Sequence, residues 1–135
     1  MTKPNKSVLL VDEDDAFRMP LSDRLKEEKI TVLEAHDGEE GLRVAIEKMP
    51  SLILLDISMP RMDGLTMLKK LREDKWGANA QVVLLTNLSD NAPIAASLEK
   101  GVFDYLVKTD WTMEELAKKV KEKLGISSKN TAKNN

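Results

Sequence analysis

The apolar residues of this chain gather in short runs that are separated by longer mixed segments. Four runs have the length of β-strands: Val8–Val11, Leu52–Leu55, Val82–Leu85 and Phe103–Val107. Three of them are continuous rather than alternating, which is typical of strands buried on both faces of a parallel sheet. A fifth run, Thr31–Ala35, mixes polar and apolar residues and predicts an edge strand.

The segments between these runs have the spacing of amphipathic helices. Their apolar residues recur every three or four positions, so each segment can cover one face of a sheet. The apolar positions are Phe17, Leu21 and Leu25; Leu42, Ala45, Ile46 and Met49; Leu65, Leu68 and Leu71; Ile94 and Leu98; and Leu116, Val120 and Leu124. The predicted order is therefore (βα)₅. In this α/β fold, right-handed crossovers place helices on both faces of one doubly wound parallel sheet.

Polar residues and one proline refine the helices. Capping-box spacing occurs at Asp37 with Glu40 and at Thr112 with Glu115, which predicts helix starts at these positions. Pro20 lies inside the first predicted helix, where a proline removes a backbone hydrogen bond and clashes with the preceding turn. We therefore expect a kink or irregular first turns, unless the helix begins late enough to put Pro20 in its first turn.

The length and composition are those of one globular domain. At 135 residues the chain has room for a single core, and 41% hydrophobic residues with 33% charged residues can form one. We expect an N-terminal extension over residues 1–5, one domain over residues 6–125, and a disordered tail or the start of a linker over residues 126–135. The chain contains no cysteine, which excludes disulfides, thiolate metal sites and cysteine nucleophiles.

The charge pattern and hydropathy argue against membrane and nucleic-acid binding. No apolar run approaches the roughly 20 residues of a membrane span, and residues 1–6 lack the apolar stretch of a signal peptide, so a cytoplasmic protein is expected. The net charge of −2 conceals an asymmetry, because residues 118–135 hold six lysines and one acid. The remainder of the chain is acidic and offers no uniformly basic face for direct contact with nucleic acid.

Chemically active side chains follow four of the predicted strands. They are Asp12, Glu13, Asp14 and Asp15 after the first strand, Asp56 after the third, Thr86 at the end of the fourth and Lys108 at the end of the fifth. Ligands of doubly wound sheets bind at this carboxyl edge. Crowded carboxylates raise one another's pKa unless a cation lies among them, and oxygen ligands favour Mg²⁺, or Mn²⁺ in its place. An aspartate beside such an ion is a competent nucleophile toward phosphorus.

The motifs around these residues resemble one family. They are Val-Leu-Leu-Val-Asp-Glu-Asp-Asp at residues 8–15, Leu-Leu-Asp-Ile-Ser-Met-Pro-Arg-Met-Asp-Gly at 54–64, Val-Leu-Leu-Thr at 83–86 and Asp-Tyr-Leu-Val-Lys at 104–108. Over roughly residues 6–124 the chain closely resembles the CheY-like receiver domains of two-component response regulators. The resemblance implies a flavodoxin-like sheet of order 2-1-3-4-5. It also implies a phosphorylation-dependent signalling switch, which catalyses only its own phosphorylation and dephosphorylation and is not otherwise an enzyme.

The resemblance also implies a role for individual residues. Asp56 would be the phosphoacceptor, Glu13 and Asp56 direct Mg²⁺ ligands, Asp12 a water-mediated ligand and the Ser58 backbone carbonyl a further ligand. Thr86 would bond the phosphoryl group, Lys108 would pair with Asp56 or its phosphate, and Tyr105 would rotate inward on activation.

The implied partners follow from these roles. The phosphoryl donor would be a sensor histidine kinase or a phosphotransfer protein. Phosphorylation would change the surface of the fourth helix, fifth strand and fifth helix, and so control a downstream protein or output domain. The same face could form a dimer.

Two residues depart from the usual pattern of the family. Glu13 stands where aspartate is commoner, and its extra methylene requires a slightly different approach to the metal. Lys108 is followed by Thr109 rather than proline, and the loop through residues 109–111 is one residue longer. Because a cis bond before a non-proline residue costs about 2.5–4 kcal/mol, the sequence leaves the isomer of the Lys108–Thr109 bond open.

Three other functions fit the sequence less well. A receiver that has become a constitutive protein-interaction scaffold would not need all of Asp56, Glu13, Thr86 and Lys108. A phosphatase of the haloacid-dehalogenase type would carry a second aspartate two residues after the nucleophile, where this chain has Ser58. A flavodoxin-like electron carrier would need a hydroxyl- and glycine-rich phosphate loop instead of the acidic residues 12–15.

Overall fold

The computed structural model describes residues 6–87 and 104–126. Its centre is a five-stranded sheet in which every neighbouring pair of strands is parallel. The strands are β1 (Ser7–Val11), β2 (Thr31–Ala35), β3 (Leu52–Asp56), β4 (Val82–Thr86) and β5 (Asp104–Val107). They lie in the order β2-β1-β3-β4-β5, which confirms the predicted topology.

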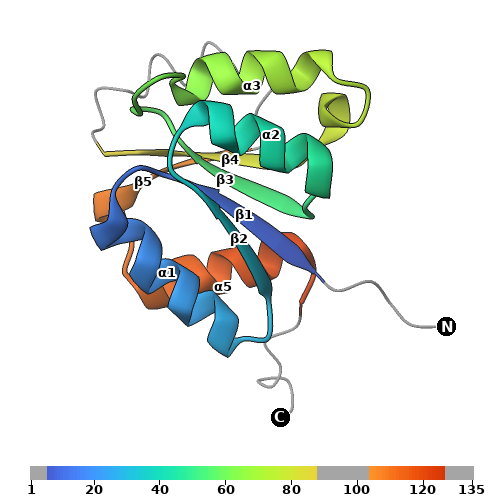
Figure 1. Ribbon diagram of the computed structural model, residues 1–135. Coiled ribbons are helices and arrows are strands. Elements are labelled where there is room, and N and C mark those ends of the chain that lie inside the picture. The colour runs from blue at the N-terminus through green and yellow to red at the C-terminus, as the bar shows by residue number, and fades with distance from the viewer. Residues whose placement is uncertain (1–5, 88–103, 127–135) are drawn as a thin grey trace, which may run out of the picture.

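Helices cover both faces of this sheet, as the sequence pattern predicted. They are α1 (Asp15–Glu27), α2 (Gly38–Lys48), α3 (Gly64–Glu73) and α5 (Met113–Leu124), with short 3₁₀ turns η1 (Gly77–Asn79) and η4 (Lys108–Asp110). In Figure 1, α1 and α5 lie on one side of the sheet while α2 and α3 lie on the other. The helix predicted around Ile94 and Leu98 falls outside the described residues, as do the expected extension at residues 1–5 and residues 127–135 of the expected tail.

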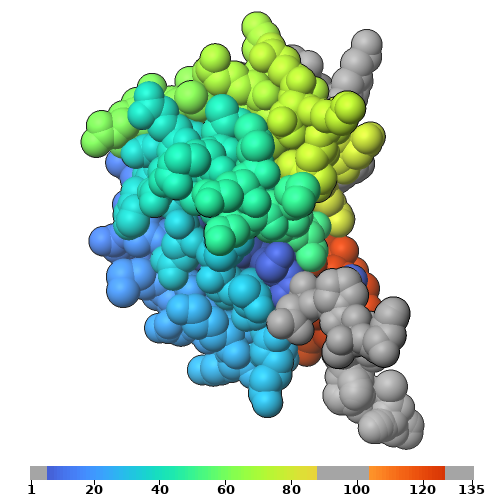
Figure 2. All heavy atoms as spheres, turned by 45° about the vertical axis from the view of Figure 1, so that its right-hand side comes forward, coloured from blue at the N-terminus to red at the C-terminus, as the bar shows by residue number. Residues whose placement is uncertain are grey.

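The alternation of side chains along the strands divides the core into two layers. Val8, Leu10, Leu52, Leu54, Val83 and Leu85 pack with residues of α1 and α5, whereas Leu9, Val11, Ile53, Leu55, Val82 and Leu84 pack with residues of α2 and α3. In Figure 2 the teal surface of α2 and the yellow-green surface of α3 adjoin on this side of the molecule. All residues of β3 and β4 are buried, but β2 is mostly half-exposed, as expected for an edge strand.

The predicted helix starts are present. The Asp37 side chain accepts a hydrogen bond from the Glu40 amide, and Thr112 and Glu115 form a complete capping box. The alternative in which Pro20 falls in a first helical turn is wrong, because α1 begins at Asp15 and continues through Pro20. At the start of α1 the Asp14 carbonyl accepts from the amides of both Phe17 and Arg18, which is an irregularity of the first turn.

Within the described residues, no helix is long and apolar enough to cross a membrane. The parallel order of the strands brings their carboxyl ends to one edge of the sheet, where polar side chains gather.

Candidate functional site

The carboxyl ends of the strands surround an open pocket of about 420 Å³. Its lining residues are Asp12, Glu13, Asp14, Asp56, Ser58, Asn87 and Lys108. These residues come from the last position of β3, from the loops that follow β1, β3 and β4, and from the turn that follows β5. Five of the seven residues predicted for the site thus line one pocket; the other two, Thr86 and Tyr105, lie on the adjoining strands.

Asp56 is the most constrained carboxylate in this pocket. It is the last residue of β3 and only 2% of its surface is exposed. Its Oδ1 atom is buried and has no hydrogen-bond partner, although the ammonium of Lys108 lies 3.3 Å away as an ion pair. The pKa of Asp56 is raised from 3.8 to about 6, chiefly by burial and also by like-charge repulsion from Asp12 and Glu13, while Lys108 opposes the rise. The negative charge of the Asp56 carboxylate is therefore only partly balanced by its neighbours.

Lys108 provides the positive charge of the site. Its Nζ atom lies 2.6 Å from Oδ2 of Asp12 and 3.3 Å from Oδ1 of Asp56, so one ammonium bridges two buried carboxylates. The same atom lies 4.3 Å from the centre of the Phe17 ring, within reach of a cation–π interaction. The bond between Lys108 and Thr109 is trans, and the chain continues directly into the turn η4.

The acidic loop after β1 is held by backbone hydrogen bonds. The Asp12 amide donates to the Ala35 carbonyl at 3.0 Å, and Oδ1 of Asp12 accepts from the Asp14 amide at 2.9 Å. Asp14 in turn caps α1 by accepting from the Ala16 amide. Glu13 is exposed and extends from this loop toward solvent. Asp12 is consequently fixed, whereas the Glu13 side chain can still adapt to a ligand.

The donor set of the pocket matches the needs of Mg²⁺. Among residues 6–87 and 104–126, no three acidic or histidine side chains converge closely enough to hold a metal ion by themselves. Mg²⁺ does not require three, because it is usually bound through one or two carboxylates and retains several waters. The uncompensated Oδ1 of Asp56, the carboxylates of Asp12 and Glu13, and the nearby Ser58 supply only oxygen ligands.

Thr86 and Tyr105 lie on neighbouring strands at the side of this pocket. Thr86 ends β4, is buried and pairs with Val107, while Tyr105 pairs with Leu84. Because residues two apart on a strand share a face, Thr86 and Tyr105 lie on the same face of the sheet, the face covered by α2 and α3. Tyr105 is 36% exposed, so its large aromatic side chain is accessible. The hydroxyl of Thr86, two positions further along the same face, is buried.

Sequence reasoning missed three residues that contact or support the site. Asn87 could have been found, because it directly follows Thr86 at a strand end. Phe17 gave no such signal, since its contact with Lys108 joins positions far apart in the chain. Arg18 is a buried guanidinium that donates to the Asp12 backbone carbonyl at 2.7 Å, and nothing in the local pattern of α1 distinguishes it from a solvated charge.

Comparisons with known proteins point to one family. Residues 8–121 match the family model described as the response regulator receiver domain. A curated relative, the probable transcriptional regulator ycf27 of Guillardia theta, is 34% identical over 124 residues, which cover 92% of this chain and 47% of the relative. The chain spans about half the length of such curated relatives.

Solved structures show the same likeness. A putative response regulator from Chloroflexus aurantiacus has 30% identity and a TM-score of 0.79, with 90% of this chain and 99% of that chain covered. The response regulator TrrA from Thermotoga maritima, in complex with Mg²⁺-BeF, has 32% identity and a TM-score of 0.75, with 87% of this chain and 98% of that chain covered.

Proposed function

Because the chain belongs to the response regulator receiver domain family, we propose that it is a signalling switch in which Asp56 accepts a phosphoryl group. The observation that carries this proposal is the buried Oδ1 of Asp56, which has no hydrogen-bond partner and lies 3.3 Å from the Lys108 ammonium. Such an atom is an available nucleophile beside a group that can neutralise phosphoryl oxygens. The family is a signalling domain rather than an enzyme in the usual sense.

The transfer would use the side chains of the pocket directly. An Asp56 carboxylate oxygen forms a bond to phosphorus while the bond from phosphorus to the donor's imidazole nitrogen breaks, and the leaving imidazole takes up a proton. With a pKa of about 6, Asp56 is largely ionised near neutral pH and can act as the nucleophile. Lys108 would shift from Asp12 toward the phosphoryl oxygens, and the Thr86 hydroxyl would bond one of them.

Mg²⁺, or Mn²⁺ in its place, would neutralise charge on the phosphoryl group during transfer. Glu13 and Asp56 would bind it directly, Asp12 through a water, and Ser58 through its backbone carbonyl. The carboxylates of Asp12, Glu13 and Asp56, which line the pocket together with Ser58, support this ligand set. Further support comes from TrrA of Thermotoga maritima, which is described in complex with Mg²⁺-BeF.

We assign the partners by the same reasoning. The donor would be a sensor histidine kinase or a phosphotransfer protein in the cytoplasm. The receiver would act on a downstream protein or an output domain, and relatives about twice as long are named as transcriptional regulators. Tyr105 on β5, together with α5 and the predicted fourth helix, whose residues lie outside the described ranges, would form the surface that changes and that could also mediate a dimer.

Intact mass spectrometry tests the proposed function. Incubation with acetyl phosphate and Mg²⁺ should add one phosphoryl group, and EDTA should prevent the addition because the carboxylates would then repel the anionic donor. A chain that takes up no phosphate under either condition would instead favour the constitutive scaffold, in which the receiver fold binds partners without modification.

Glu13→Gln should weaken Mg²⁺ binding because it removes a charged ligand while preserving the side-chain size. We expect a loss of at least about tenfold, since even residues that only support a metal ligand contribute that much. Calorimetric titration of the folded protein measures the dissociation constant. Asp14→Asn is the matched control, because it removes one charge from the same loop and asparagine still caps α1. Equal affinities for the two variants would rule out Glu13 as a direct ligand.

Thr86→Ala should still be phosphorylated but should transmit the signal poorly, since the nucleophile remains while a contact to the phosphoryl group is lost. Tyr105 is the single tyrosine of the chain, so its ring signals can be followed selectively by NMR. The phosphorylation-dependent change in these signals should shrink in Thr86→Ala and persist in Thr86→Ser, which retains the hydroxyl. If alanine and serine gave the same change as threonine, the proposed coupling would be wrong.

A further inference from the structure

A polar network beside the pocket centres on the buried Arg18. Its side chain is only 5% exposed, yet it belongs to α1 and carries a full positive charge. The guanidinium donates to Oε1 of Glu34 at 2.7 Å, to the backbone carbonyl of Asp12 at 2.7 Å and to Oδ1 of Asp15 at 2.6 Å. One side chain therefore joins the edge strand β2, the end of β1 and the first turn of α1.

Glu34 holds Arg18 from the edge of the sheet. Glu34 pairs with Leu10 across the β1–β2 ladder, and Leu10 belongs to the core layer beneath α1 and α5. The glutamate thus extends beneath α1, where its second oxygen accepts a hydrogen bond from the Ser22 hydroxyl at 3.0 Å. Both carboxylate oxygens are used, so the position of the guanidinium is fixed by a rigid sheet rather than by solvent.

The bond to the Asp12 carbonyl has a consequence for the acidic loop. In a planar trans peptide the carbonyl and the following N–H point in opposite directions, so fixing the Asp12 oxygen fixes the whole peptide between Asp12 and Glu13. The Asp12 amide and both carboxylate oxygens are already bonded, to Ala35, Asp14 and Lys108. Arg18 donates to the backbone carbonyl, which is the remaining polar group of Asp12, and so sets the direction in which the backbone leads to Glu13.

We propose that Arg18, held by Glu34, is a positioning residue for the divalent-cation site. It touches neither the metal nor the phosphoryl group, and it acts by orienting the peptide that precedes Glu13. This inference rests on the proposed function, in which Asp12 and Glu13 help to bind Mg²⁺. Without Arg18 the peptide can rotate, and Mg²⁺ binding must then order it, so the affinity falls.

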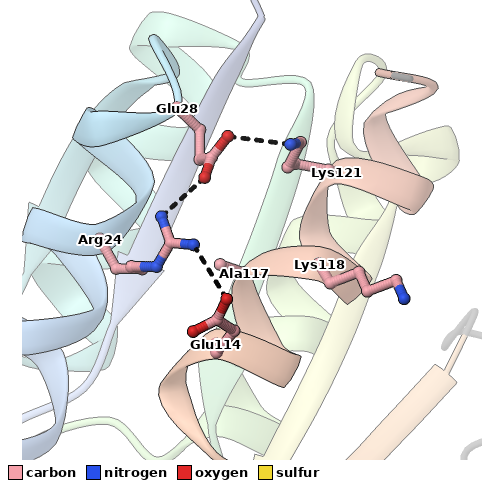
Figure 3. Close-up of a pocket in the computed structure, with 6 residues that line it drawn as sticks. All are labelled: Arg24, Glu28, Glu114, Ala117, Lys118 and Lys121. Carbon is pink, nitrogen blue, oxygen red and sulfur yellow. Dashed lines mark hydrogen bonds and ion pairs between the residues drawn. The ribbon is translucent and has the colours of Figure 1, made fainter. Parts of the chain in front are cut away.

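Arg24 offers a matched control on the same helix. It forms ion pairs with Glu28 at 2.6 Å and with Glu114 at 3.6 Å, and Glu28 also pairs with Lys121 of α5. Figure 3 shows this group bridging α1 and α5, without a residue of the acidic loop among those drawn. Arg24→Met therefore removes a charge and comparable ion pairs from α1 but leaves the Asp12 carbonyl bonded.

The experiment measures the Mg²⁺ dissociation constant by calorimetry and the amide shift of Glu13 by NMR, with thermal unfolding in EDTA as a check on folding. Arg18→Lys keeps a charge for Glu34, but its single nitrogen cannot reach the three acceptors that Nε, Nη1 and Nη2 of Arg18 hold. Arg18→Met combined with Glu34→Leu removes the buried charge together with its partly buried partner, which leaves no unpaired charge behind. Both variants should bind Mg²⁺ roughly tenfold more weakly, as supporting residues of metal sites do. Arg24→Met should bind it like the unaltered protein.

Three outcomes overturn the inference, and they differ in whether the proposed function also fails. If the unaltered protein binds Mg²⁺ and the folded Arg18 variants bind it equally well, Arg18 is structural only and the proposed function stands. If the unaltered protein itself binds no Mg²⁺, both the proposed function and the positioning role are wrong. A weaker affinity in Arg24→Met, equal to that in Arg18→Lys, would also count against positioning.

Discussion

Asp56→Asn should abolish phosphorylation and at the same time stabilise the metal-free protein. The amide is not a nucleophile toward phosphorus, so the mass increase seen with acetyl phosphate and Mg²⁺ should disappear. The gain in stability follows from the cost of the buried charge. A pKa raised from 3.8 to about 6, chiefly by burial, corresponds to roughly 3 kcal/mol against the ionised form. We expect the free energy of unfolding near neutral pH to rise by about 1–3 kcal/mol.

The same substitution should remove part of the pH dependence of the free energy of unfolding. The folded protein keeps the Asp56 proton up to about pH 6, whereas the unfolded chain releases it near pH 3.8. Between these values the native state binds more protons than the unfolded state, so its stability falls as the pH rises and levels off above about pH 6. In Asp56→Asn this decline is absent, and the two stability curves should converge toward acid pH.

Urea unfolding in EDTA at several pH values between 4.5 and 7.5 measures this difference. Asp63→Asn is a suitable control, because Asp63 is an exposed acid that caps α3 and asparagine can replace it as a cap. That variant should be phosphorylated normally and should keep the pH dependence of the unaltered protein. If Asp56→Asn still took up phosphate, another residue would be the phosphoacceptor. If its stability depended on pH as in the unaltered protein, the buried charge of Asp56 would not be the cause of that dependence.

The strand ends explain why much of the site could be predicted from the sequence. Buried parallel strands appear as continuous apolar runs, and the first polar residue after each run must lie at the carboxyl edge of the sheet. This rule alone brought Asp12, Asp56 and Lys108 together, and the structure places all three in one pocket. Thr86 follows the same rule at the end of β4, although it is buried beside the pocket rather than lining it.

The supporting contacts could not be predicted, because they depend on how separate elements pack. Because of Glu34, the Thr31–Ala35 run simply mixes polar and apolar residues in the sequence. In the structure this glutamate accepts a hydrogen bond from the buried Arg18 of α1. The sequence pattern does not show that Arg18 faces this anchor, since residues 18 and 34 meet only when α1 packs against β2. Likewise the departure from proline at Thr109 left the isomer of the Lys108–Thr109 bond open, and only the structure shows a trans bond with the ammonium between two carboxylates.

Lys108→Met should have the second large effect, on both chemistry and stability. Removing the ammonium leaves Asp12 and Asp56 as buried neighbours without a cation, and the loss of one partner from a buried ion pair costs on the order of 3 kcal/mol. Because Lys108 lowers the pKa of Asp56, the variant should hold that proton to a higher pH, and acid should partly restore its stability. Phosphorylation by acetyl phosphate should slow on the order of a hundredfold, the usual cost of removing one electrostatic contact to a transition state.

Mg²⁺ separates this role from a general loss of packing. In the unaltered protein the cation must compete with the Lys108 ammonium for Asp12 and Asp56, whereas in Lys108→Met it meets two uncompensated carboxylates. The rise in melting temperature on adding Mg²⁺ should therefore be larger in the variant than in the unaltered protein. Lys121→Met is the matched control: it loses one partly buried ion pair to Glu28, for about 1 kcal/mol or less, and should gain no extra stabilisation from Mg²⁺. If Mg²⁺ stabilised Lys108→Met no more than Lys121→Met, the ammonium would not be what balances the two carboxylates in the metal-free protein.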